Sequence, residues 1–394
     1  MHRNNLVFAA ACMGMLLFGI VFLSLGAANN MLAARFQLDD NAIGTLTALL
    51  PLGILIGSLV FGPVVDRFGY RWPLIGAALT VGAGLEGMAF GSSERMIQLF
   101  VFLIGLGGGV LNGATNALAA DVAENDRGAK LSLLGVFFGI GALAMPGTLA
   151  ALSQRFSTSS IVAGIGGLVL IPVAYCLAIA FPPPKQRADR FSLTAGLALL
   201  RRPIFLLAGL ALAIQSGMEG MSNDWMTRYF SQVALVGESG AEWKTQLGLV
   251  AVAGAMMATR LVLAAMLTRI GSRRVLLASV GVTALGAITL QAGAGYEASL
   301  AGALLIGAGL AAAFPVVLGY IGDLYPQQSG TAFSTIFVLA LTGNMVINKT
   351  FGYVAQAYGV EHYAKMMLGC LVCSALLLVL IFRQLDDTTS NGTR

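Results

Sequence analysis

The stretch Gly62-Pro-Val-Val-Asp66-Arg67-Phe-Gly69-Tyr-Arg71 is a short polar turn between two long apolar runs. Glycine tolerates the backbone conformations that a tight reversal of the chain requires. One acid and two arginines lie close together in this turn, and they can form a charge cluster at a membrane surface. The stretch therefore predicts a connection between two membrane-spanning helices.

The same turn recurs in the second part of the chain, as Thr268-Arg269-Ile-Gly271-Ser-Arg273. Arg269 lies 202 positions after Arg67, and the glycine and the second arginine keep their spacing, whereas a threonine replaces the acid. One such turn is a weak signal. Two of them, each between the second and third apolar runs of a half, predict two similar halves, which is a repeat pattern of secondary transporters.

The composition is that of an integral membrane protein. Of the 394 residues, 57% are hydrophobic and 10% are charged, and the mean hydropathy is +0.82. Soluble domains carry about 25% charged residues, and apolar stretches of about 20 residues cross a bilayer as helices. The sequence predicts twelve spans, at roughly 6–34, 43–65, 73–91, 97–120, 130–152, 160–181, 203–230, 245–267, 275–295, 298–321, 331–356 and 364–383.

The longest polar break in the chain begins at Pro182 and predicts the domain division. We expect an N-terminal six-helix bundle at 1–181, a cytoplasmic linker at 182–202 and a C-terminal six-helix bundle at 203–394. Most of the 23 lysines and arginines fall in alternate loops, and the positive-inside rule then places both termini in the cytoplasm. The first span is too long for a cleaved signal peptide, so we expect a multi-pass protein of a bacterial inner membrane.

Charge and residue usage argue against several classes of function. The net charge of +5 predicts no nucleic-acid partner, because membrane topology already explains the basic loops. The four cysteines lie in apolar runs and the two histidines near the surface, so we expect no metal and no cofactor. No nucleophile–base pair or phosphate loop is evident, which predicts a protein that is not an enzyme. We expect a monomer whose partners are lipid and a small solute.

Polar side chains within the predicted spans indicate the substrate site, because a polar group in a span normally faces water or a partner. Gln215, Glu219 and Asn223 follow one another at four-residue intervals and so share a helix face. Amides donate and accept hydrogen bonds and so suit a neutral polyhydroxyl solute, although they can also simply bond helices together. The expected substrate-binding residues are Asn29, Asn30, Asn112, Asn116, Gln215, Glu219, Asn223, Trp225, Asn344 and Asn348.

Glu219 is the leading candidate for a group that carries a coupling proton, because an apolar environment disfavours the charged form of a carboxyl group. The competing interpretation is a fixed ion pair with Lys349 or Arg260, which are themselves candidates for coupling. Glu86 in the third span is a further candidate, with a structural role as the alternative. Coupling to protons or sodium and simple uniport all stay open. Asp224 is expected at the rim of the cavity.

Charged residues at the cytoplasmic ends of several spans form a second set. We interpret them as a network that gates the cytoplasmic side, the alternative being charges solvated in loops. The residues are Asp66, Arg67, Arg71, Asp121, Arg127, Arg269 and Arg273.

These motifs together resemble the fucose-permease-like (fucose:H+ symporter) sugar porters of the major facilitator superfamily. The repeated turn resembles the loop motif of the superfamily, and Gly217-Met-Glu219 with Trp225 and Tyr229 resembles a seventh-span motif of these porters. Gly135 stands where the porters often have histidine, and Asn112 where many have an acid. The resemblance implies an all-α membrane fold of twelve helices in two pseudo-symmetric bundles and a monosaccharide-type substrate.

The residues and the resemblance together predict a secondary transporter of a monosaccharide or related polyol, coupled to protons and working by alternating access. The first alternative is a transporter of an organic anion such as a sugar acid, or an exporter of an amphiphilic compound. It rests on Lys349, Arg260 and several methionines in the spans. A membrane receptor that does not transport is the remaining hypothesis.

Overall fold

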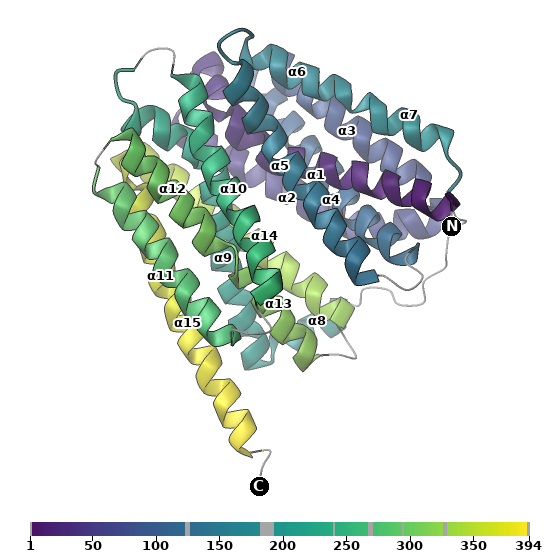
Figure 1. The fold of residues 1–394 in the computed structure, drawn as a ribbon, viewed down its shortest axis with the longest axis vertical. Helices are drawn as coiled ribbons and strands as arrows, with labels where there is room; N and C mark the ends of the chain where they lie inside the picture. The colour runs from purple at the N-terminus through teal and green to yellow at the C-terminus, as the bar shows by residue number, and fades with distance from the viewer. Residues whose placement is uncertain are drawn as a thin grey trace. The chain divides into compact units, whose positions relative to one another are not determined.

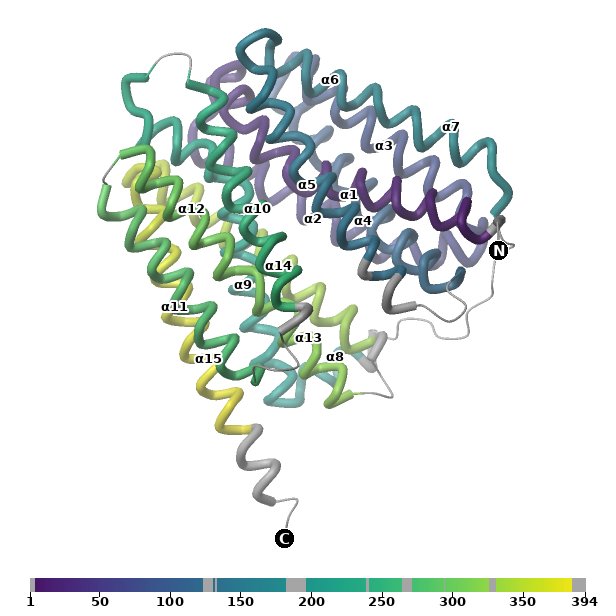
Figure 2. The backbone as a smooth tube through the Cα atoms, in the orientation of Figure 1, coloured from purple at the N-terminus to yellow at the C-terminus, as the bar shows by residue number. Residues whose placement is uncertain are grey.

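The computed structural model of this chain describes residues 2–122, 127–181, 193–238, 241–266, 271–293, 295–325 and 329–391. The elements assigned within these ranges are helices, as Figure 1 and Figure 2 show. Twelve helical segments of the described residues are long and apolar enough to cross a membrane. The predicted all-α fold with twelve spans is therefore confirmed.

The first six spans comprise seven helices. They are α1 (His2–Phe36), α2 (Asp40–Phe68), α3 (Arg71–Phe90), α4 (Glu94–Asp121), α5 (Arg127–Leu152), α6 (Thr158–Leu168) and α7 (Leu170–Ala178). The last two form one span between them. The other helices are α8 (Leu193–Leu200), α9 (Pro203–Tyr229), α10 (Glu242–Met266), α11 (Ser272–Gln291), α12 (Tyr296–Leu310), α13 (Ala313–Leu324), α14 (Ser329–Tyr358) and α15 (Tyr363–Asn391). A π-helical turn, Phe230–Ala234, extends α9.

The turn between α2 and α3 shows why its glycine is needed. Gly69 has a φ of 71°, which L-residues with a side chain rarely adopt. Its N–H donates to the carbonyl of Val65 and so caps the last turn of α2. At the other end of α2, the Asp39 side chain accepts from the N–H of Ala42 as an N-cap. Local chemistry thus fixes both ends of this span.

The chain divides into two compact units. The first contains Met1–Ala188 and Asn223–Ala253, and the second contains Asp189–Ser222 and Gly254–Arg394. The division falls within α9 and within α10, so the adjoining ends of these two helices belong with α1 to α7. The domain boundaries expected from the sequence, at 182 and 203, stay a prediction.

Glycines set the separation of α2 and α4 in the first unit. A Cβ atom built on Gly53 of α2 would lie 2.3 Å from the carbonyl oxygen of Phe102. One built on Gly105 of α4 would lie 2.2 Å from the carbonyl oxygen of Leu50. Real side chains cannot approach so closely, so the two backbones can touch only because both residues are glycine.

The tenth span is interrupted in the second unit. The helix α12 ends at Leu310 and α13 begins at Ala313. The carbonyl of Leu310 accepts a hydrogen bond of 2.8 Å from the side-chain amide of Gln215 in α9. Lipid offers no partner for a carbonyl that a broken helix leaves free. Gln215 therefore stabilises the interruption.

We expect Gly105→Ala to lower the melting temperature of the detergent-solubilised protein, because the added methyl group must displace the α2 backbone. Gly135→Ala in α5 is the matched control, since no atom lies within 4 Å of its added Cβ. Alanine has the higher helix propensity, so the control should melt at the same or a higher temperature. Equal melting of the two variants would contradict the close packing of α2 and α4.

We expect Gln215→Met to destabilise the protein by about 0.5–2 kcal/mol, because it keeps the chain length but leaves the Leu310 carbonyl without a donor. Unfolding in increasing SDS measures the loss. Gln98→Met is the control, because the Gln98 amide bonds Glu94, one turn earlier on the same helix, at the protein surface. A Gln215 variant as stable as this control would show that the break does not need the amide.

Candidate functional site

The interrupted tenth span, α9 and α10 form a polar cluster in the second unit. Nη2 of Arg260 lies 3.2 Å from Oε1 and 3.4 Å from Oε2 of Glu219. Nε of Arg260 donates to the carbonyl of Ala311, 3.5 Å away, within the interruption. Gln215 lies one turn before Glu219 on α9. Its side-chain amide donates to the carbonyl of Leu310, the residue before Ala311. Two side chains thus satisfy two successive carbonyls, and Glu219 holds one of those side chains in place.

The ion pair is buried on one side and open on the other. The Glu219 side chain is 9% exposed, whereas that of Arg260 is 34% exposed. Pairing compensates two charges that would each be very costly alone in an apolar interior. Arginine has five N–H donors in all, and about a third of the Arg260 side chain is exposed. Lys349 is the other cation considered for Glu219, and its Nζ lies 4.6 Å from the ring centre of Tyr353.

Amides of α14 connect this helix to α9 in the same unit. The Asn344 amide donates to the carbonyl of Ser216 at 2.9 Å, and the Asn348 amide donates to Oδ1 of Asn344 at 2.8 Å. Gly220 leaves space for the Asn344 side chain, since a Cβ at this position would lie 2.4 Å from the Asn344 amide nitrogen. Both asparagines are buried. In this arrangement Asn344 bonds α14 to α9, and Asn348 holds the Asn344 side chain in place.

Asn112 and Asn116 lie one turn apart on α4 in the first unit. The Asn116 amide donates to Oδ1 of Asn112 at 3.0 Å. Both residues are half-buried.

Four further predicted site residues take part in helix packing in the first unit. The Asn29 amide donates to the carbonyl of Asp224 at 2.7 Å, and the Asn30 amide donates to that of Thr227 at 3.1 Å. Asn223 is 3% exposed and Trp225 is fully buried. These residues close the contact between α1 and the end of α9 in this structure.

Asp224 differs from its expected place at the rim of a cavity. Its side chain is 4% exposed, and its Oδ1 has no hydrogen-bond partner among the described residues. The expectation was wrong because Gly26 lets α1 close over this residue: a Cβ at Gly26 would lie 3.0 Å from the Asp224 Cα. In the sequence, Gly26 was the one indication that another helix could approach α1 closely here. A glycine in an apolar run does not identify the residue that it contacts.

Glu86, a coupling candidate, packs against α6. Its Oε1 would lie 2.7 Å from a Cβ on Gly166 of that helix. Another residue pair was not foreseen at all, the ion pair of Arg228 in α9 with Asp40 at the start of α2. The two residues are far apart in sequence, and nothing local connects them.

Several residues of the expected cytoplasmic gate have partners outside the gate where the structure describes them. The Tyr70 hydroxyl donates to Oδ2 of Asp121 at 2.6 Å. Arg71 donates to the carbonyl of Leu177, and the Arg67 guanidinium lies 5.3 Å from the ring centre of Phe68.

Arg273 donates to the carbonyl of Phe382 and lies over its ring. Asp66 is half-buried. Arg269 and the side chain of Arg127 lie outside the described residues. The gate network therefore stays a prediction.

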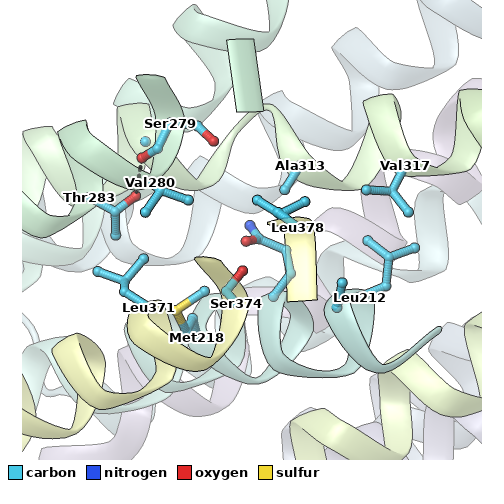
Figure 3. Close-up of a pocket in the computed structure, with 13 residues that line it drawn as sticks. Leu212, Met218, Ser279, Val280, Thr283, Ala313, Val317, Leu371, Ser374 and Leu378 are labelled. Atoms are coloured by element: carbon cyan, nitrogen blue, oxygen red, sulfur yellow. Dashed lines mark hydrogen bonds between the residues drawn. The ribbon is translucent and has the colours of Figure 1, made fainter. Parts of the chain in front are cut away.

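A small cavity adjoins Gln215 in the second unit, and Figure 3 shows the side chains that line it. Ser279, Thr283 and Ser374 contribute hydroxyl groups among leucine and valine side chains. The Thr283 hydroxyl donates to the Ser279 carbonyl. The volume is about 10 Å³, which is about the space that one water molecule needs. A monosaccharide does not fit, so this cavity is not the substrate site.

Curated proteins similar to this chain include transporters of two kinds. The 4-hydroxybenzoate transporter of Pseudomonas putida is 26% identical over 175 residues, which are 43% of this chain and 39% of that protein. The arabinose-proton symporter of Escherichia coli K12 is 26% identical over 189 residues, 47% of this chain and 39% of the symporter. The chain thus spans about two fifths of the length of these relatives.

The fold matches that of a solved transporter. The crystal structure of a D-xylose-proton symporter superimposes with a TM-score of 0.76 and 16% identity, covering 94% of this chain and 97% of that one. The family model described as Major Facilitator Superfamily matches residues 6–258, more than half of the chain. Twelve candidate spans, the interrupted helix with its polar cluster and this match agree, and the chain therefore belongs to the major facilitator superfamily of membrane transporters.

Proposed function

We propose that this protein is a proton-coupled secondary transporter of a monosaccharide or related polyol, which it moves by alternating access. The observation that carries the proposal is the partly exposed ion pair of Glu219 and Arg260 beside the interrupted tenth span. Discontinuous helices form substrate sites in many secondary transporters. The similarity to an arabinose-proton symporter supports the same class of substrate.

The charge of the cluster favours a neutral solute. Glu219 compensates Arg260, so a solute that meets the pair encounters a carboxylate acceptor and guanidinium donors with no net charge. A hydroxyl group can donate to the one and accept from the other. The fucose-permease-like subtype within the superfamily stays a prediction.

Glu219→Gln tests the ion pair. We expect uphill uptake and counterflow exchange to fall together by about tenfold or more, because the variant weakens a hydrogen-bonded charge pair and leaves Arg260 uncompensated. Arg260→Gln should reduce both activities to the same extent. The double variant should lose less activity than the sum of the two single losses, expressed as free energies, because the two residues interact. Uptake into proteoliposomes measures both activities. Glu94→Gln, a glutamate that bonds Gln98 at the surface, is the matched control.

Two outcomes would revise this role of Glu219. Loss of uphill uptake with intact counterflow would make Glu219 itself the carrier of the coupling proton. Normal uphill uptake by Glu219→Gln would remove the residue from the mechanism. Replacing the pH gradient with a sodium gradient in the same vesicles shows which cation drives uptake, and uptake driven by sodium alone would contradict proton coupling.

A second candidate function is the transport of a small organic anion. The observation that favours it is the exposure of Arg260, which is 34% exposed while its partner is 9% exposed. A guanidinium group binds a carboxylate through two parallel hydrogen bonds. The similarity to a 4-hydroxybenzoate transporter supports this class. A carboxylate solute would then have to compete with Glu219 for the same arginine.

A thermal-shift screen separates the two candidates, because a ligand that binds the folded state raises its melting temperature. We expect a pentose or hexose to raise the melting temperature of the purified protein, and 4-hydroxybenzoate and a sugar acid to leave it unchanged. A shift by an acid that Arg260→Gln abolishes would establish the second candidate instead. No shift with any of these compounds at millimolar concentration would contradict both.

A further inference from the structure

The contact between α1 and the end of α9 in the first unit is made by side chains that bond backbone carbonyls. The Asn29 amide donates to the Asp224 carbonyl at 2.7 Å, and the Thr227 hydroxyl donates to the Gly26 carbonyl at 2.6 Å. The carbonyl oxygen of Asn223 lies where a side chain at Gly26 would have to be. The helices are therefore in direct backbone contact at Gly26.

Helix α10 joins the same contact through Gln246. Its amide donates to the carbonyl of Ala27 at 2.8 Å. Each of the two amides, Asn29 and Gln246, uses its nitrogen for a backbone carbonyl. Rotating either amide by half a turn would oppose two oxygens, so the orientation of both groups is fixed by their partners.

Three buried oxygen atoms of this contact lack a hydrogen-bond donor among the described residues. They are Oδ1 of Asn29, Oδ1 of Asp224 and Oε1 of Gln246. The three residues are 0%, 4% and 1% exposed. A buried acceptor without a donor costs about 1–3 kcal/mol. The contact therefore has too few donors for its acceptors.

The charged groups on the surrounding helices are engaged elsewhere. Arg228 of α9 pairs with Asp40 of α2. Arg35 donates to the Ala89 carbonyl, Glu242 accepts from the Thr158 hydroxyl, and Lys244 pairs with Glu238. An ionised carboxyl group buried without a cation is very costly. The closed contact is thus incompatible with an ionised Asp224.

We propose that the contact of α1 with α9 closes only when Asp224 carries a proton. A proton taken from water forms an O–H bond on the carboxyl group, which removes the charge and supplies a donor to a contact that lacks donors. When the helices separate, that O–H bond breaks and the proton returns to water. The inference rests on the proposed transport by alternating access, and it assigns the proton to Asp224 rather than to Glu219, which already has Arg260 as its partner.

Cysteine labelling measures the opening of this contact. The four native cysteines are first replaced by serine or alanine, and Thr227→Cys then places a thiol at a fully buried position of the contact. Val236→Cys, at a position that is 71% exposed, serves as the reference in a second protein. Because ionisation of the thiol also depends on pH, the measured quantity is the ratio of the two rates of labelling by a water-soluble maleimide in detergent.

With Asp224 present, we expect the ratio to rise as the pH is raised, by up to about tenfold per pH unit, because one proton is linked to closure. Asp224→Asn is neutral at every pH and should keep the ratio low throughout. Glu242→Gln is the matched control, because Glu242 already has a partner in Thr158, and its ratio should rise as in the parent.

A ratio in the parent that does not change with pH would overturn the proposal, and so would an Asp224→Asn protein that keeps the parent's pH dependence. If the Asn variant does not fold, Asp224→Glu replaces it. A glutamate at this position must shift the midpoint of the rise, and an unchanged midpoint would equally overturn the proposal.

The labelling requires no substrate, so the two proposals fail separately. A pH-dependent ratio in a protein that takes up none of the tested solutes would contradict the proposed function alone. Uptake with a ratio that does not change with pH would contradict only the role of Asp224.

Discussion

The structure depends on one constraint, that each backbone carbonyl and N–H group in a membrane span needs a partner within the protein. Unbroken helices meet this constraint by themselves, and the tenth span, which is broken, does not. Gln215 and Arg260 supply hydrogen bonds to Leu310 and Ala311 at the break. Because Arg260 brings a charge into the span, Glu219 is needed beside it. A local requirement of the backbone thus places a glutamine and an ion pair at one point of the second unit, and the proposed chemistry of the site follows from that placement.

Two carboxyl groups on one helix have contrasting surroundings. Glu219 is compensated by a guanidinium group that remains partly exposed, which suits the binding of a polar solute. Asp224, five residues further along α9, is buried with an oxygen that lacks a donor among the described residues. The difference arises from packing, since Gly26 lets α1 approach closely enough to cover Asp224. The proposed roles, solute binding at Glu219 and proton binding at Asp224, would let each carboxyl group be tuned by its own neighbours.

Membership of the major facilitator superfamily sets the frame for these roles but does not choose the substrate. The relatives include an arabinose-proton symporter and a 4-hydroxybenzoate transporter at equal identity, 26%. A site whose arginine is paired with a glutamate has features that suit either a sugar or a carboxylate. Its net charge favours a sugar, whereas the exposure of its guanidinium group favours a carboxylate. The share of the arginine's donors that Glu219 occupies therefore bears directly on substrate class.

The sequence by itself determined the features that depend on neighbouring residues. The twelve spans follow from long apolar runs, the turn at Gly69 follows from the conformational freedom of glycine, and the pairing of Asn112 with Asn116 follows from the period of a helix. Only the tertiary structure decided that Glu219 pairs with Arg260, since Arg260 and Lys349 were equally available, and that Asp224 is buried rather than at a rim. These contacts join residues that are 41 and 195 positions apart. No local pattern encodes them, because they depend on which helix faces meet and on where a missing side chain allows two backbones to touch.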